Sequence, residues 1–171
     1  MDSLTIALPL IKKSEGLRLE AYPDPATKGK PFTIGWGATY YENGSAIQPG
    51  DKITRQQAEK LLLFHAGKAR EAVKKLVKVN INPNQEAALI SLIFNIGEGN
   101  LAKSTLLKKI NKDPKDPTIN AEFNKWIYAN KKVFPGLVNR RQEESALFFK
   151  PVVISGVLLA AAGLLLFYFL K

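Results

Sequence analysis

The last part of the chain constrains the fold most, because it is too long and too uniformly apolar for the core of a small domain. Residues 151–170 carry no charged side chain and read PVVISGVLLAAAGLLLFYFL. As a helix rising 1.5 Å per residue, such a segment spans about 30 Å, the hydrocarbon thickness of a bilayer. Aromatic residues and a lysine stand at each end, as interfacial anchors do. The sequence therefore predicts a folded domain over residues 1–149 and a single transmembrane helix over residues 150–171.

Small residues at Gly156, Ala160 and Gly163 fall on one face of this predicted helix. Such a face lets a second membrane helix approach closely, and it fits equally well against lipid. The expected partner of residues 151–170 is therefore the lipid bilayer, with a partner helix as an open alternative.

The remaining sequence has the composition of one basic domain without disulfides. The chain contains no cysteine and has 25 lysine and arginine residues against 15 aspartate and glutamate residues. This balance favours anionic partners such as nucleic acid, lipid head groups or an acidic cell wall. The basic residues are spread along predicted helices without interleaved aromatic residues, so we expect no nucleic-acid binding.

Near the N-terminus, the sequence predicts a helix followed by a small antiparallel hairpin. The helix ends at Glu15, and Pro9 indicates a late start or a kink, because proline costs an interior helix about 3 kcal/mol. Apolar and polar residues alternate over residues 17–22 as in a half-buried strand, and a second strand-like run covers residues 31–34. Turn-forming residues separate the two runs, and the glycines of the following GWG sequence allow another reversal.

Two carboxylates flank the first of these strands, with Glu15 before it and Asp24 after it. Glycoside hydrolysis uses such a pair: one carboxyl group protonates the departing sugar oxygen, and the other stabilises the positively charged sugar or activates water. The negative end of a helix and an apolar wall would both favour a protonated Glu15, as a general acid requires. Surface carboxylates are common, so the pair alone is weak evidence.

The rest of the domain is predicted to be mostly helical. A capping box at Thr54 begins a long helix that should run to about Lys78, and the lone histidine on it, His65, is expected to pack or lie on the surface. Residues 83–96 are apolar nearly all round and should form the buried helix of the larger lobe.

Three shorter helices are predicted beyond it, over residues 104–110, over residues 121–130 and from Arg140 onward. In the helix predicted over residues 121–130, we expect Trp126 to pack in the core, with contact to a sugar as the weaker alternative. Arg140 and Arg141 form ordinary helix-surface pairs in one interpretation. In the other interpretation, Arg140 or Arg141 pairs with Glu15 across a cleft between two lobes of the domain.

Three stretches together resemble the phage-type lysozymes, the endolysins of glycoside hydrolase family 24. They are EGLRLEAYPDPATKGKPFTIGWGAT at 15–39, NQEAALISLIFNIGEGNLAKSTLLKKIN at 84–111 and PGLVNRRQEESALF at 135–148. They occur in the order expected for the family, and the resemblance covers nearly all of residues 4–149.

This resemblance implies an α+β fold with two lobes, a small antiparallel hairpin sheet and a mainly helical lobe, here followed by the transmembrane helix. It also implies a muramidase that cleaves the β-1,4 bond between N-acetylmuramic acid and N-acetylglucosamine in bacterial peptidoglycan, without a cofactor or metal. The implied catalytic residues are Glu15 as general acid, Asp24 as the second carboxylate, and Thr33, which positions water or the substituted anomeric carbon.

The sequence departs from the family pattern in two places. Eight residues separate Asp24 from Thr33 where the family usually has five, and Thr27 is a weaker alternative to Thr33. The histidine that often follows the second glycine is Ala38 here. Trp36, between the glycines, either binds substrate by stacking on a sugar ring or packs under the hairpin.

A C-terminal span fits a lytic enzyme held in the virion membrane of a lipid-containing phage and used when the phage enters the cell. An enzyme held in the host inner membrane and used for host lysis is the second possibility. The competing class is a non-catalytic wall-binding or structural membrane protein on a lysozyme scaffold. The presence of Glu15, Asp24 and Thr33 together favours the enzyme.

Overall fold

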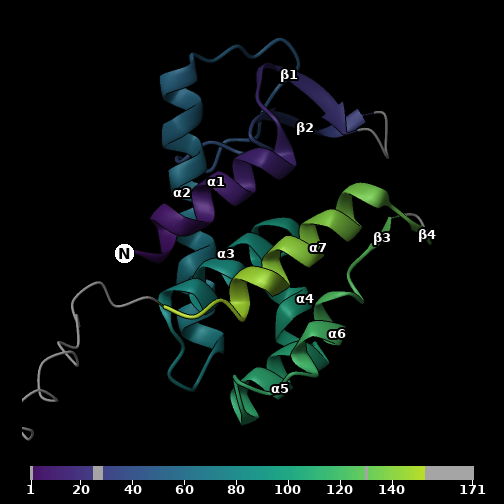
Figure 1. The fold of residues 1–171 in the computed structure, drawn as a ribbon. Coiled ribbons are helices and arrows are strands. Elements are labelled where there is room, and N and C mark those ends of the chain that lie inside the picture. Colours follow the sequence, from purple (N-terminus) through teal and green to yellow (C-terminus); the bar gives the residue numbers. More distant parts are fainter. Residues whose placement is uncertain (1, 25–28, 130, 153–171) are drawn as a thin grey trace, which may run out of the picture.

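The computed structural model describes residues 2–24, 29–129 and 131–152, which form two lobes (Figure 1). The predicted membrane segment lies almost wholly outside these ranges. Its first described residues, 150–152, are not helical, and the rest of the predicted helix is not described. Within the described ranges, no helix combines the length and the apolar character that crossing a bilayer requires.

Helix α1 (Ser3–Glu15) leads into the smaller lobe and ends at Glu15, as predicted. The side chain of Asp2 caps its start by accepting hydrogen bonds from the N–H groups of Leu4 and Thr5 at 3.1 and 3.4 Å. The helix runs through Pro9, so of the two predicted outcomes, a late start or a kink, the late start is wrong. The proline removes one backbone hydrogen bond of the helix. Packing against other helices and the capped first turn offset the stability that is lost with it.

Strands β1 (Arg18–Asp24) and β2 (Gly29–Gly35) form the predicted antiparallel hairpin, with Tyr22 opposite Thr33. Asp24 is the last residue of β1 rather than the residue after it. The register shifts between Arg18 and Tyr22, where β1 contains more residues than the facing part of β2.

The extra residues of β1 pair on the strand's other side. The Ala21 N–H donates to the Asp51 carbonyl at 2.9 Å, and the Ile53 N–H donates to the Leu19 carbonyl at 2.9 Å. Leu19 is exposed, so the predicted alternation of buried and exposed side chains holds only in part.

After β2 the chain reverses at two glycines and then enters the long helix. Ile34 and Ala38 bond to each other through both N–H and C=O groups, and Gly35 and Gly37 between them have φ angles of 65° and 87°. Helix α2 (Arg55–Leu76) begins with the predicted capping box and contacts both β2 and the larger lobe, so it joins the two lobes.

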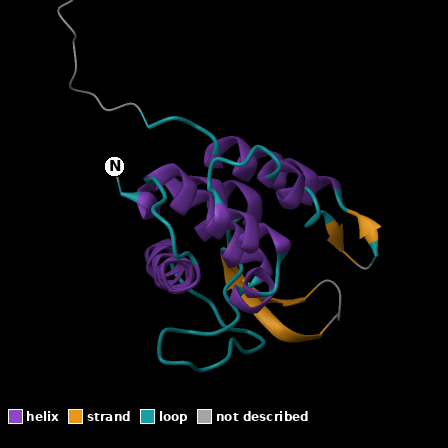
Figure 2. Ribbon diagram, turned by 90° about the horizontal axis from the view of Figure 1, so that it is seen from below, coloured by secondary structure: helices purple, strands orange, loops and turns teal. Residues whose placement is uncertain are grey.

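Helix α3 (Pro83–Ile96) is the centre of the larger lobe. It contacts α1, α2 and α7 (Pro135–Phe148), and residues 87–93 are all buried, which confirms the predicted core helix. Figure 2 shows the helices gathered around it. The lobe also contains α4 (Glu98–Ala102), α5 (Thr105–Lys112), α6 (Ile119–Phe123), β3 (Tyr128–Ala129) and β4 (Lys132–Val133).

Two predicted boundaries in this lobe are wrong. The helix expected over residues 121–130 ends at Phe123, because the chain turns there and Tyr128 pairs with Val133 in the β3–β4 hairpin. Helix α7 begins at Pro135, so Arg140 and Arg141 lie in its middle. Trp126 is half-buried against the hydrophobic core, which supports its interpretation as a packing residue.

Candidate active site

Glu15 lies where helix α1 gives way to the hairpin. Gly16 ends the helix with a φ of 68°, and its N–H donates to the Lys12 carbonyl at 3.2 Å. The Glu15 side chain is 22 % exposed. The structure therefore presents a partly accessible carboxyl group at the junction of the two lobes.

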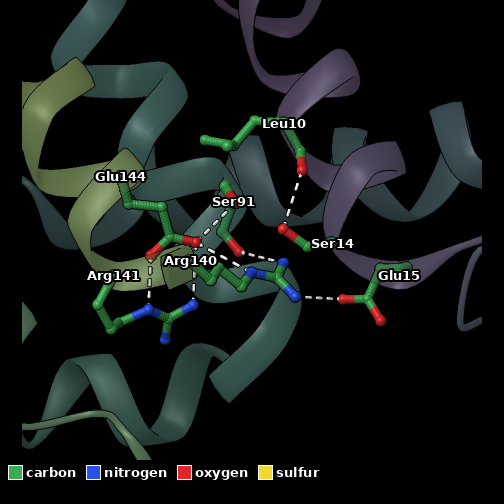
Figure 3. A network of polar contacts seen from close by, with 7 residues as sticks. All are labelled: Leu10, Ser14, Glu15, Ser91, Arg140, Arg141 and Glu144. Carbon is green, nitrogen blue, oxygen red and sulfur yellow. Dashed lines mark hydrogen bonds and ion pairs between the residues drawn. The ribbon is translucent and has the colours of Figure 1, made fainter. Parts of the chain in front are cut away.

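Arg140 of α7 holds this carboxyl group from the larger lobe (Figure 3). Its Nη1 donates to Glu15 Oε1 at 2.5 Å, its Nη2 donates to the Ser91 carbonyl at 3.1 Å, and its Nε donates to Glu144 Oε1 at 3.1 Å. The side chain is buried, and its planar guanidinium has donors in fixed directions. Arg140 is therefore the arginine that pairs with Glu15, and it fixes the position of Oε1.

A fully buried ion pair supports Arg140 from behind. Arg141 Nε lies 2.8 Å from Glu144 Oε2, Arg141 Nη2 donates to Glu144 Oε1 at 2.9 Å, and the Ser91 hydroxyl donates to the same oxygen at 2.7 Å. Burial raises the pKa of Glu144, against the opposing effect of the two arginines. Burial also lowers the pKa of Arg141, against the effect of Glu144. Two guanidinium groups and two carboxyl groups thus form one cluster, in which each charge has an opposite partner.

Gly37 lies against the same carboxyl group from the smaller lobe. A Cβ atom added to Gly37 would stand 3.2 Å from Glu15 Oε2, and the φ of 87° disfavours any other residue. The glycine is needed for both the turn and the close approach. Glu15 is therefore held between Arg140 on Oε1 and Gly37 beside Oε2.

Asp24 and Thr33 both lie in the hairpin that follows Glu15. Asp24 ends β1 opposite Gly29, and Thr33 is half-buried in β2 opposite Tyr22. The alternative to Thr33, Thr27, lies outside the described residues. The hairpin thus carries Asp24 and Thr33 in the smaller lobe, and in the sequence it follows closely after Glu15.

Trp36 is a core residue. It is 5 % exposed, packs in the main hydrophobic cluster, and has the Lys12 ammonium 4.8 Å from its ring centroid. Because almost none of the ring is accessible, sugar stacking on Trp36 is the wrong interpretation. The ring packs in the main core and not in the separate cluster behind the hairpin. Ala38 is also buried, at the end of the turn that Trp36 occupies.

His65 has a packing role. Its Nε2 lies 3.0 Å from the Tyr40 carbonyl, and its ring stands edge-on to the Tyr40 ring with centroids 4.5 Å apart. Burial lowers the pKa of His65, which keeps the ring neutral at pH 7.

The sequence reasoning missed Gly37, Ser91 and Glu144 as parts of this site. Glu144 follows Arg140 at the i,i+4 spacing of an ordinary surface pair, so nothing in the spacing signalled burial. Gly37 belongs to the GWG turn, and only the closeness of Glu15 shows its second role.

The sequence profile of the family described as phage lysozyme matches residues 12–144. The chain belongs to the phage lysozyme family. The matched range contains Glu15, Asp24, Thr33, Arg140 and Glu144.

Relatives and solved structures agree with this membership. The chain is 41 % identical to the endolysin of Bacillus phage PZA over 139 residues, which cover 81 % of this chain and 52 % of the relative. It is 40 % identical to the endolysin of Salmonella phage P22 over 139 residues, which cover 81 % and 91 % of the two chains. The solved structure of the endolysin from Escherichia coli O157:H7 phage FAHEc1 is similar with a TM-score of 0.75 and 35 % identity, over 85 % of this chain and 92 % of that chain.

These similarities confirm the predicted phage-lysozyme fold, with its small hairpin sheet and mostly helical lobe. The chain spans about half the length of the Bacillus phage endolysins that it matches.

Proposed function

We propose that this protein is a peptidoglycan-degrading lysozyme that hydrolyses the β-1,4 bond between N-acetylmuramic acid and N-acetylglucosamine. Membership of the phage lysozyme family and the similarity to phage endolysins support hydrolysis of the cell wall. The observation that carries the proposal is the setting of Glu15, a partly exposed acid between two lobes, held by a buried arginine and backed by a glycine.

In this mechanism Glu15 is the general acid. Arg140 occupies Oε1, so a proton on Oε2 passes to the glycosidic oxygen as the bond between that oxygen and the anomeric carbon breaks. The hydrogen bond from Arg140 then stabilises the carboxylate that remains. Because the buried cluster fixes the guanidinium, it also fixes the direction in which Glu15 presents its proton.

Asp24 and Thr33 serve the other side of the reacting sugar in this mechanism. Asp24 stabilises the positive charge that develops at the anomeric carbon, and it either takes a proton from the attacking water or forms the covalent intermediate. Thr33 positions the water or the substituted carbon. The proposal is supported by their places at the end of β1 and within β2, in the hairpin that begins three residues after Glu15.

Clearing of purified cell walls tests the proposal, with native protein compared with Glu15→Gln. The matched control is Glu20→Gln, because Glu20 is an exposed acid of the same hairpin and pairs with Lys52 at 2.6 Å. We expect Glu15→Gln to slow clearing by about 100-fold or more and Glu20→Gln to leave it within about twofold. Native-like clearing by folded Glu15→Gln protein would refute the mechanism.

We also propose that residues 151–170 anchor the catalytic domain, residues 1–149, to a membrane, either the virion membrane of a lipid-containing phage or the host inner membrane. The length and uncharged character of the segment support this proposal. The described chain leaves the domain at a defined place, because Asn84 Nδ2 at the start of α3 donates to the Lys150 carbonyl at 3.0 Å.

A further inference from the structure

Arg18 is an exposed cation that a neighbouring ring holds in place. It is the first residue of β1, and its guanidinium carbon lies 4.7 Å from the centroid of the Tyr22 ring. At this distance the ring face attracts the cation. Stacking restrains a guanidinium group without using its N–H donors, so these donors can still bind an anion.

No acid in the described part of the chain forms an ion pair with Arg18. Other arginines of the domain are paired, because Arg70 contacts Asp2 and Arg140 contacts Glu15. The acid next to Arg18 in β1, Glu20, pairs with a lysine instead, at 2.6 Å. Arg18 therefore presents its positive charge to partners outside the domain.

The stacked pair lies on the face of the hairpin that carries Thr33. Ile34 is buried in the core cluster of the smaller lobe, and Ala21 and Phe32 pack against that cluster. Thr33 lies between Phe32 and Ile34, so the strand alternation directs its side chain to the other face. Tyr22 follows Ala21 and is paired directly with Thr33, which places the Tyr22 ring on that second face as well.

The register of the hairpin also places Arg18 between the proposed catalytic residues. Arg18 pairs with Gly35, and the turn that follows Gly35 reaches the Glu15 carboxyl group. The next pair along the strands is Tyr22 with Thr33. Arg18 thus lies along the hairpin between Glu15, three residues before it, and the Tyr22–Thr33 pair.

We propose that Arg18, held on Tyr22, binds a carboxylate of the glycan substrate. N-acetylmuramic acid has a lactyl group, which ends in a carboxylate or carries a stem peptide with carboxylates of its own, whereas N-acetylglucosamine has neither. A guanidinium group can donate two parallel hydrogen bonds to such a carboxylate. The inference rests on the proposed peptidoglycan substrate, and it assigns the residue that recognises the negative charge of that substrate.

The test measures KM and kcat of the full-length chain, in detergent, on soluble glycan strands from peptidoglycan. One preparation keeps its stem peptides, and a second has lost them to an amidase, which frees the lactyl carboxylates. Part of each is treated with carbodiimide and methylamine, which convert carboxylates into neutral amides. Native protein is compared with Arg18→Gln, with Arg18→Lys and with the control Lys108→Gln, which removes one exposed positive charge from α5 in the larger lobe.

For native protein, we expect neutral amides to raise KM about 3- to 10-fold and to leave kcat within about twofold. An effect on stripped strands alone assigns the lactyl carboxylate, and an effect on peptide-bearing strands alone assigns the stem peptide. Arg18→Gln should have the raised KM on untreated strands and no further increase on neutral ones. Arg18→Lys should keep part of the difference because it keeps the charge, and Lys108→Gln should behave as native protein.

The assignment would be overturned if neutral amides changed KM equally for native protein and Arg18→Gln, or changed it for neither. An equal loss of discrimination in Lys108→Gln would also overturn it, because the effect would then follow net charge. A fall in kcat without a change in KM would show that Arg18 only supports the hairpin. Failure of the proposed function has a different signature, because native protein would then cut none of the four preparations.

Discussion

At the scale of single residues, the account depends on how two side chains far apart in sequence hold one carboxyl group. Arg140 reaches Glu15 from the larger lobe, and Gly37 approaches it from the smaller lobe. The resemblance to the family pointed to Glu15, and helix periodicity placed it at a helix end. The choice of Arg140 over Arg141 depends on which face of α7 is turned toward Glu15, and no local pattern in the sequence encodes that.

Replacing Arg140 by lysine should impair both activity and stability. Lysine keeps one charge but cannot reach Glu15, Glu144 and the Ser91 carbonyl together. We expect clearing of cell walls to fall at least about tenfold and the free energy of unfolding to fall by about 2–4 kcal/mol. Lys13→Met, which breaks the exposed pair with Glu143, is the control and should change stability by less than about 1 kcal/mol. Denaturant unfolding and initial clearing rates provide the two readouts, and native values of both would refute the positioning role.

Gly37→Ala should lower activity more than its backbone strain alone explains. The new methyl group would press on Glu15 Oε2 at 3.2 Å, and φ at Gly37 is 87°. Gly44→Ala is a matched control, because Gly44 has a φ of 86° with nothing within 4 Å of an added Cβ atom. Both variants should lose about 1 kcal/mol of stability from the unfavourable φ. Only Gly37→Ala should slow wall clearing severalfold, and similar clearing by the two variants would contradict the close-approach role.

At the scale of elements, local signals predicted most of the helix starts and the hairpin. The capping box at Thr54 is confirmed, and so is the end of α1 at Glu15. The prediction failed over residues 121–130, where Phe123 and Trp126 suggested helical spacing. Pairing of Tyr128 with Val133 ends that helix, and a two-residue strand is too short to show an alternating pattern.

Glu122 ties α5 to α6, and its contribution should depend on pH. Its carboxylate accepts hydrogen bonds from Thr105 and from Lys125, and Lys109 lies 3.3 Å from it. These contacts lower its pKa from 4.5 to about 2. Because the pKa is lower in the folded state, the stabilisation is complete above about pH 4.5 and is lost as the pH falls toward about 2.

Glu122→Gln should therefore lower the free energy of unfolding by about 1–3 kcal/mol at pH 7. The difference from native protein should shrink as the pH falls from about 4.5 to about 2, because native Glu122 then becomes neutral as well. Glu71→Gln, which breaks an exposed pair with Lys74 at 3.0 Å, should show little difference at any pH. Urea unfolding at several pH values gives the comparison, and a constant difference for Glu122→Gln would contradict the assigned pKa.

At the scale of the whole molecule, a two-lobed domain is joined to a long apolar segment. The family resemblance predicted the lobes and their order, and the fold confirms both. The C-terminal end of α7, which precedes the proposed anchor, lies on the opposite side of the molecule from the two hairpins (Figure 1).

Leu159→Arg tests the anchor, because it places a charge near the middle of residues 151–170. A charge at the centre of a membrane helix costs about 2.5–3.5 kcal/mol of insertion free energy. We expect the native chain and the control Leu159→Ala to stay with membranes during alkaline extraction, and Leu159→Arg to be partly released. Complete release of the native chain would refute the anchor while leaving the catalytic proposal intact.

The most direct test of the central claim is the identity of the reducing ends that native protein creates in purified peptidoglycan. Digests are reduced with borohydride and analysed by mass spectrometry, in parallel with a digest by Glu15→Gln protein. Cleavage after N-acetylmuramic acid, with Glu15 as the acid, predicts new muramitol ends that accumulate with native protein and are nearly absent with the variant. Reduced N-acetylglucosamine ends, or muramitol formed equally by the variant, would contradict the account.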